Sequence, residues 1–265
     1  DLAECLPQER KYLLERHLAS PDLVREFRQR GLVLSRDLSR VVMVNEEDHL
    51  RLQVFRSGFD PVTTCADALA LDTELEETLD FAFADDLGYL TACPTNVGTG
   101  IRVSVMLHLP ALKMTGEIDK LRRAAKDMHL AVRGFHGEGT EALGDFYQVS
   151  NQVTLGRSEQ DILGEFQHQI IPQVIEYEHR ARAALVEQRP ALLDDRVFRA
   201  WGILKSARML GSEEALYLLS HLRLGVAMGR IKGVDISTIN ELFVLTQPAH
   251  LQKITRQPLA GEQRR

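Results

Sequence analysis

The chain has 265 residues, a mass of 29.9 kDa and a formal net charge of −6, which is enough sequence for a catalytic domain with a helical appendage. Its basic residues are scattered rather than gathered into a stripe, which argues against a nucleic-acid-binding protein. No apolar run is long enough to span a bilayer, and the N-terminus lacks a signal-peptide pattern. We therefore expect a cytoplasmic protein that does not enter a membrane.

The N-terminal part of the chain predicts two helices followed by three strands. Apolar residues recur at helical spacing from Leu6 to Leu18. Ser20 and Pro21 are typical of an N-cap and a first helical position, for a second helix that ends near Arg28. Runs of β-branched and alternating apolar residues predict strands, the first two joined as a hairpin, at 31–35, 40–44 and 50–54.

The middle of the chain alternates between helices and strands. The pattern predicts helices at 60–83 and 115–128, and strands at 89–93, 101–109, 130–133 and 146–155. The strand at 101–109 alternates cleanly, with His108 on its polar side. This order favours an α+β fold with a largely antiparallel sheet flanked by helices.

From Ser158 to the end, the sequence predicts helices alone. Ser158 and Asp161 have the spacing of a capping box, and Pro172 is expected to kink the helix that follows. Pro190 is the clearest linker position. We therefore divide the chain into a mixed α+β domain at 1–188 and an all-α C-terminal domain at 189–265.

A run of acidic residues is the first candidate site. Glu46, Glu47 and Asp48 interrupt an apolar, strand-forming segment. Such a run is usually a solvated turn, but burying carboxylates between apolar flanks is costly unless cations share the site. If the strand continues, Glu47 and Arg51 project from one face, which would place a carboxylate beside a guanidinium.

Two loops supply further candidates. The small-residue loop from Cys93 to Arg102 matches neither a Walker A loop nor a dinucleotide fingerprint, so a structural turn is the simplest interpretation. The chain's three cysteines are odd in number and widely spaced, which predicts free thiols and no metal site, and Cys93 alone is more often a core residue than a reactive thiol. The glycine-rich loop after Arg133 is either an ordinary connection or a closing lid.

Taken together, these segments resemble the phosphagen kinase superfamily, and the run from Tyr89 to Pro110 is similar to its bacterial protein arginine kinase branch. The similarity covers nearly the whole chain, including the segments 15–22 and 245–251. It implies a phosphagen-kinase-like domain followed by a helical, dimerising domain. It also implies ATP-dependent transfer of the γ-phosphoryl group to arginine side chains of proteins.

The resemblance assigns ATP binding to four positions of this chain. Arg51, Arg102 and Arg133 correspond to arginines that hold the nucleotide phosphates, and Asn96 lies in the loop between Cys93 and Arg102. Mg²⁺ is expected to bridge the phosphates. Fixed guanidinium groups suit this role because phosphoryl transfer develops negative charge on oxygens that arginine binds with two parallel hydrogen bonds.

The resemblance also assigns the residues that handle the acceptor arginine. Glu47 is expected to be the base and Glu46 its orienting partner, because a guanidinium has to lose a proton as it attacks. Glu138 corresponds to a loop glutamate that binds arginine, and Cys93 to a thiolate that orients the guanidinium.

Several features depart from the pattern of the superfamily. The upstream Ser-x-Arg-x-Arg strand, which supplies two more phosphate-binding arginines, is not present, and the chain opens with Asp1, so we interpret the sequence as lacking its N-terminal segment. Gln148 and His136 stand where some relatives have aspartate and an aromatic residue. The phosphoarginine-binding Arg-Asp-x-x-Arg-Ala motif of the branch is not seen before Arg265.

The family's usual role implies further partners and leaves alternatives. Phosphorylated proteins would be marked for degradation by a Clp protease in a stress response, with a zinc-binding activator protein and a heat-shock repressor as partners and a homodimer as the assembly. One alternative is a kinase of free L-arginine. The other, motivated by the missing upstream arginines, is a non-catalytic phosphoarginine-binding or dimerisation module.

Overall fold

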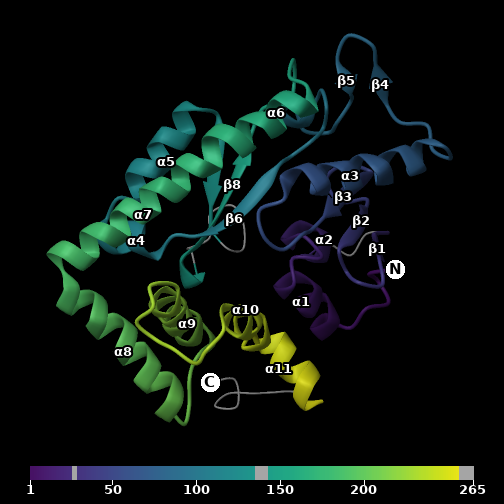
Figure 1. Ribbon diagram of the computed structural model, residues 1–265. Coiled ribbons are helices and arrows are strands. Elements are labelled where there is room, and N and C mark those ends of the chain that lie inside the picture. Colours follow the sequence, from purple (N-terminus) through teal and green to yellow (C-terminus); the bar gives the residue numbers. More distant parts are fainter. Residues whose placement is uncertain (26–28, 135–142, 257–265) are drawn as a thin grey trace. The chain divides into compact units, whose positions relative to one another are not determined.

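The computed structural model describes residues 1–25, 29–134 and 143–256 (Figure 1). Contacts within the chain define two compact units. The first consists of Asp1–Val105 and Ser150–Pro172, and the second of Met106–Val149 and Gln173–Arg265. Within the described residues, no helix is both long and apolar enough to cross a membrane.

The first unit opens with two helices and a three-stranded sheet: α1 (Pro7–Glu15), α2 (Pro21–Arg25), β1 (Gly31–Leu34), β2 (Arg40–Val44) and β3 (Leu50–Val54). The strands pair antiparallel in the order β1-β2-β3. Val41 and Met43 of β2 are buried with Leu18 and Leu23, so the apolar side of the sheet packs against the helical segment. These five predicted elements are confirmed, while the predicted end of α2 near Arg28 lies outside the described residues.

Helix α3 (Pro61–Glu76) starts as predicted, with the Asp60 carboxylate accepting the Thr63 N–H at 3.2 Å. It ends earlier than predicted, because the next segment forms the hairpin β4 (Phe83–Ala84) and β5 (Gly88–Tyr89). The Tyr89 hydroxyl lies 2.6 Å from Glu76 Oε1 and 3.0 Å from Asp72 Oδ2, which holds the hairpin at the end of α3. The strand predicted at 89–93 is therefore wrong beyond its first residue.

The predicted kink before Pro172 is a widened helical turn. Helix α6 (Glu159–Glu165) begins at Ser158, whose hydroxyl accepts the Asp161 N–H at 3.1 Å, so the predicted capping box is confirmed. The π-helical turn η3 (Phe166–Ile170) follows, and the chain continues as α7 (Ile171–Gln188). Because Pro172 has no N–H to donate to the preceding turn, the wider turn relieves the interruption.

The second unit contains the later helices and most of a second sheet, whose strand order is β6-β8-β7. The predicted helix at 115–128 corresponds to α5, which begins at Ile118. The short helix α4 before it was not predicted, and it ends at Gly116, which takes a φ of 76°. Helices α8 and α10 pack against α9 (Figure 1). The elements are β6 (Ser104–His108), α4 (Pro110–Thr115), α5 (Ile118–Asp127), β7 (Leu130–Arg133), η2 (Leu143–Asp145), β8 (Phe146–Asn151), α8 (Pro190–Ser206), α9 (Ser212–Ala227), α10 (Ile236–Leu245) and α11 (Pro248–Thr255).

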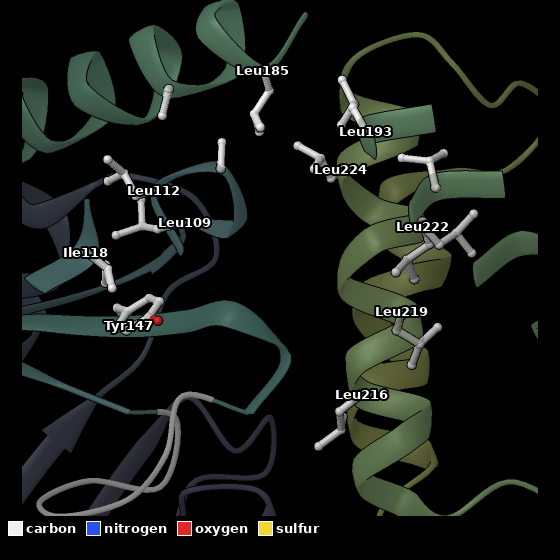
Figure 2. Close-up of a cluster of buried hydrophobic side chains, with 14 of the residues drawn as sticks. Leu109, Leu112, Ile118, Tyr147, Leu185, Leu193, Leu216, Leu219, Leu222 and Leu224 are labelled. Carbon is white, nitrogen blue, oxygen red and sulfur yellow. The ribbon is translucent and has the colours of Figure 1, made fainter. Parts of the chain in front are cut away.

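The core of the second unit joins residues from both sides of the predicted domain boundary. Figure 2 shows Leu109 and Tyr147 in the same buried cluster as the leucines of α9. Leu185 of α7 and Leu193 of α8 flank Pro190 and belong to this cluster. Each buried leucine contributes roughly 1.5–3 kcal/mol. The division at 188/189 stays a prediction about domains, while the packing of this unit is continuous across it.

A chain of buried polar side chains crosses the same core. The Arg223 guanidinium donates to His108 Nδ1 at 2.9 Å, so His108 Nε2–H donates to Ser220 Oγ, also at 2.9 Å. Ser220 in turn donates to Asp145 Oδ2 at 2.5 Å, and Lys113 pairs with the other oxygen of Asp145 at 2.8 Å. Burial, together with the charge of Arg223, holds the pKa of His108 well below its ordinary value, so the ring is neutral. The expectation that His108 lies on a polar face is wrong.

Two helical glycines give a test of this packing. Gly225 of α9 faces α8 so closely that an added Cβ would clash with the buried Val197 side chain, whereas Gly202 of α8 has open space. Gly202→Ala should raise the free energy of unfolding by about 0.5–1 kcal/mol, because alanine favours helix. Gly225→Ala should instead lower it by about 1–3 kcal/mol, because the clash outweighs that gain. Urea unfolding of both variants measures this, and equal effects would contradict the packing of α8 on α9.

Candidate active site

The acidic segment is a tight turn between β2 and β3. Val44 pairs directly with Leu50, and the Asn45 N–H donates to the His49 carbonyl at 2.9 Å. Asn45 closes the turn with a φ of 58°, a conformation that asparagine tolerates better than most residues. The strand therefore does not continue through this segment. The expectation that Glu47 and Arg51 share one strand face is wrong, and the carboxylate beside Arg51 belongs to Glu46.

Glu46 is nearly buried, with 5% of its side chain exposed. Its Oε1 accepts hydrogen bonds from the Ser20 hydroxyl and from Arg51 Nη1, the latter at 3.3 Å. Its Oε2 accepts the Glu47 N–H at 2.8 Å. Burial raises the pKa of the Glu46 carboxyl, but the hydrogen bonds from Ser20 and Glu47 and the charges of Arg51 and Arg30 outweigh it and lower the pKa below its ordinary value. Glu46 is therefore an ionised carboxylate that accepts three hydrogen bonds.

Glu47 has the opposite environment. It is exposed and lines an open hollow of about 490 Å³, together with Gln29, Arg30 and the rest of the acidic turn. The two adjacent glutamates are thus differentiated by their surroundings. Glu46 organises its neighbours, and Glu47 presents a carboxylate to anything that enters from solvent.

The acidic turn is connected to the loop that carries Cys93. The Asp48 carboxylate accepts the N–H of Ala92 at 2.6 Å, which places the turn beside the residue that precedes Cys93. Cys93 is half-buried and a free thiol, and its Sγ lies 3.0 Å from the hydroxyl of Thr95. The structure therefore brings the predicted thiol and the predicted carboxylates to the same part of the first unit.

The loop after Cys93 has a defined conformation. Asn96 is half-buried in the short helix η1 (Pro94–Asn96). The buried Thr154 hydroxyl lies 2.7 Å from the Val97 carbonyl and 3.2 Å from the Thr95 carbonyl. Gly98 has a φ of 115°, and an added Cβ would lie 2.8 Å from the backbone of Leu155. Only glycine suits this position, because both the conformation and the close approach exclude a side chain.

Arg102 is held by the buried side chain of Asn151. The Asn151 amide accepts the Val103 N–H at 2.8 Å and donates to the Ile101 carbonyl at 3.1 Å, so it binds the backbone on both sides of Arg102. The Arg102 side chain is exposed, and its Nε donates to the Asn151 carbonyl at 3.4 Å. The backbone that carries this guanidinium is therefore fixed by hydrogen bonds on both sides.

The remaining candidates lie elsewhere in the chain. Arg133 is the half-buried last residue of β7 in the second unit. Glu138 and His136 lie outside the described residues. The first unit contains the other six predicted site residues, namely Glu46, Glu47, Arg51, Cys93, Asn96 and Arg102.

Sequence reasoning missed the residues that hold the site together. Ser20 was predicted as a helix cap and lies in the segment 15–22 of the family resemblance, and its hydroxyl does accept the Leu23 N–H at 3.0 Å. Nothing in the local sequence indicates that the same hydroxyl reaches Glu46, which lies 26 positions later. The contacts of Asn151 and Thr154 likewise carried no local signal, because their partners are 48 to 59 positions away.

Two sequence profiles match this chain. The profile of the ATP:guanido phosphotransferase C-terminal catalytic domain matches residues 1–181, and that of the protein-arginine kinase McsB C-terminal domain matches residues 190–265. The first of these covers every described residue of the candidate site.

Curated proteins and solved structures agree with these profiles. The protein-arginine kinase of Pelotomaculum thermopropionicum is 47% identical over 263 residues, which is 99% of this chain and 74% of the relative. That of Brevibacillus brevis is 48% identical over 258 residues, 97% of this chain and 72% of the relative. The substrates and partners of these relatives are not thereby those of this chain.

Among solved structures, the duplicated taurocyamine kinase of Schistosoma mansoni is 28% identical, with a TM-score of 0.57 over 66% of this chain and 25% of that chain. A lombricine kinase is 26% identical, with a TM-score of 0.54 over 68% of this chain and 53% of that chain. These similarities confirm the predicted α+β, phosphagen-kinase-like fold. With the two profiles and the close relatives, they show that the chain belongs to the protein-arginine kinase family of ATP:guanido phosphotransferases.

Proposed function

We propose that this protein transfers the γ-phosphoryl group of MgATP to arginine side chains of proteins. The observation that carries the proposal is the order of the two profile matches, in which a protein-arginine kinase C-terminal domain follows directly on a guanido phosphotransferase domain. The carboxylates, thiol and guanidinium groups of the first unit supply chemistry that suits this reaction. ATP enters as its Mg²⁺ complex, in which the ion neutralises part of the phosphate charge.

In this proposal, Arg51 and Arg102 bind the phosphates of the nucleotide, joined by Arg133 and with Asn96 beside them. Arg51 is oriented by Glu46 at 3.3 Å, and Arg102 by the backbone clamp of Asn151. Guanidinium groups held in advance stabilise the charge that develops on the transferring group without reorganising during the reaction. The exposure of both side chains leaves room for phosphate oxygens.

The acceptor chemistry follows from the difference between the two glutamates. An arginine guanidinium is protonated and not nucleophilic, so Glu47 accepts one of its protons as the nitrogen attacks the γ-phosphorus. The new N–P bond forms while the bond to the β-phosphate oxygen breaks, and ADP leaves with that electron pair. Cys93, with Glu138, orients the guanidinium. Glu46 keeps its charge and its partners throughout.

The finer biological role is also part of the proposal. A helical domain after the catalytic domain suits a dimer and a surface for protein substrates. The family's usual role adds a zinc-binding activator protein and a heat-shock repressor as partners, and delivery of the phosphorylated proteins to a Clp protease in the cytoplasm. Analytical ultracentrifugation of the purified protein tests the dimer. A molecular mass equal to that of the monomer would contradict the proposed dimerisation.

The activity itself is tested with labelled ATP. The full-length protein should label casein with an acid-labile, base-stable phosphoryl group, which is typical of phosphoarginine, and should label free L-arginine poorly. Preferential labelling of free L-arginine would favour a small-molecule kinase. No label on either acceptor, with retained binding of phosphoarginine, would favour a non-catalytic binding module.

The role of Glu47 gives a first prediction about activity. Glu47→Gln should lower kcat by about 10²–10⁴-fold, because the amide cannot accept the proton of the acceptor guanidinium. Thermal unfolding should change little, because the side chain is exposed. Glu74→Gln on the exposed side of α3 is the matched control and should keep full activity. An active Glu47→Gln enzyme would remove Glu47 from the mechanism.

The role of Arg51 gives a second prediction. Arg51→Lys keeps the charge but loses the planar fork that binds Glu46 and phosphate together, so kcat/KM for ATP should fall by about 10²-fold. Arg36→Lys is the control, because Arg36 is also exposed and lies in the turn between β1 and β2. Steady-state kinetics with varied ATP measures both variants. Equal kinetics for the two would show that Arg51 does not contact the nucleotide.

A further inference from the structure

Ser20 stands at the junction of a helix start and the acidic turn. Its hydroxyl accepts the Leu23 N–H at 3.0 Å, which caps α2, and donates its own proton to Glu46 Oε1. The Ser20 hydroxyl is therefore both a hydrogen-bond acceptor and a hydrogen-bond donor. Because α2 fixes the oxygen from one side, the proton points toward Glu46.

Arg30 reinforces the same junction from the backbone. Its Nη1 donates to the Asp22 carbonyl in α2, and its Nη2 donates to the Glu46 carbonyl at 3.4 Å. The guanidinium thus ties the first turn of α2 to the acidic turn. The position of Ser20 relative to Glu46 is set by these main-chain contacts and does not depend on the Ser20–Glu46 hydrogen bond alone.

The contacts of Glu46 are complete only with Ser20. Without the hydroxyl, Oε1 keeps Arg51 alone, at 3.3 Å and with 42% of the Arg51 side chain exposed. A solvent-exposed ion pair of this kind restrains a side chain weakly. A carboxylate with one less donor can rotate, and both Arg51 and the Glu47 main chain would follow, since both are bonded to it.

We propose that Ser20 is a positioning residue for phosphoryl transfer, because its hydroxyl holds the Glu46 carboxylate in the orientation that aligns Arg51 with the nucleotide and leaves Glu47 to receive the proton. The inference rests on the proposed kinase function and extends it to a residue outside the acidic motif. Ser20 touches neither ATP nor the acceptor. It acts through Glu46.

The test compares Ser20→Gly with Ser20→Thr in the full-length protein. Glycine is also a favourable N-cap residue, so Ser20→Gly disturbs α2 little while removing the donor to Glu46. Threonine keeps both hydrogen bonds. Ser158→Gly is the control for loss of a capping hydroxyl, because Ser158 caps α6 in the same unit through Asp161.

The acid limb of the pH profile is the decisive readout. The titratable and charged groups that face or adjoin the Glu46 carboxylate are Arg30, Arg51, Glu47, Asp48 and His49. Since the Ser20 hydrogen bond lowers the pKa of Glu46, its removal raises that pKa, and the acid limb of kcat/KM should move to higher pH. At pH 8, the KM for ATP should rise roughly 3- to 10-fold as Arg51 loosens. Ser20→Thr should restore both values.

The outcomes separate the inference from the proposed function. If the wild type is active and Ser20→Gly has the same pH profile, the role of Ser20 is overturned and the kinase function stands. The same holds if Ser158→Gly shifts the acid limb as much as Ser20→Gly does. A wild type that labels no protein arginine would overturn the function itself. Carbon-13 titration of the Glu46 carboxyl, assigned with Glu46→Gln, follows the pKa without any activity and should show the same upward shift in Ser20→Gly.

Discussion

The set of three hydrogen bonds accepted by the Glu46 carboxylate, from Ser20, Arg51 and the Glu47 N–H, is the constraint on which the predicted site depends. It lies at a two-stranded turn, where Val44 and Leu50 bring its flanks together. A buried carboxylate is costly unless cations and hydrogen-bond donors surround it, and here both are present. The same contacts that remove this cost orient Arg51 outward and hold the main chain of Glu47, so the stability of the turn and the geometry of the site have one cause.

Phosphoryl transfer is favoured by charged side chains that are held in position before the reaction begins. Its transition state is loose, and a protein contributes chiefly by placing charges in advance. In the first unit, each predicted charge is placed by a group that does not react, namely Ser20 for Glu46, Glu46 for Arg51 and Asn151 for the backbone at Arg102. Asp48 similarly holds the loop of Cys93 through Ala92. The side chains of Glu47, Arg51 and Arg102 are exposed, whereas those of Glu46 and Asn151, which hold this part of the chain, are buried.

The sequence predicted what depends on local pattern and missed what depends on distance. Alternation identified β1, β2 and β3, and the family motif identified Glu46, Glu47 and Arg51 as one constellation. The interpretation of a continuous strand at Glu47 failed, because the positive φ of Asn45 turns the chain there. The predicted end of α3 was wrong because the helix ends where Glu76 binds the hydroxyl of Tyr89, and no helix-breaking residue in the local sequence marks this position. The contacts of Ser20 with Glu46 and of Asn151 with the backbone at Arg102 could not be found, since these partners lie far along the chain.

The two adjacent glutamates show why the assignment of roles needs the structure. In the sequence, Glu46 and Glu47 are adjacent residues of the same type, and only the family resemblance favours Glu47 as the base. Burial and three donors keep Glu46 ionised and occupied, so a proton placed on it would break contacts to Ser20, Arg51 and the Glu47 amide together. A proton on exposed Glu47 breaks none of these. Glu47 can therefore change its charge with the least disturbance of the site. The assignment of Glu47 as the base and Glu46 as its orienting partner follows from the hydrogen bonds that each carboxylate makes.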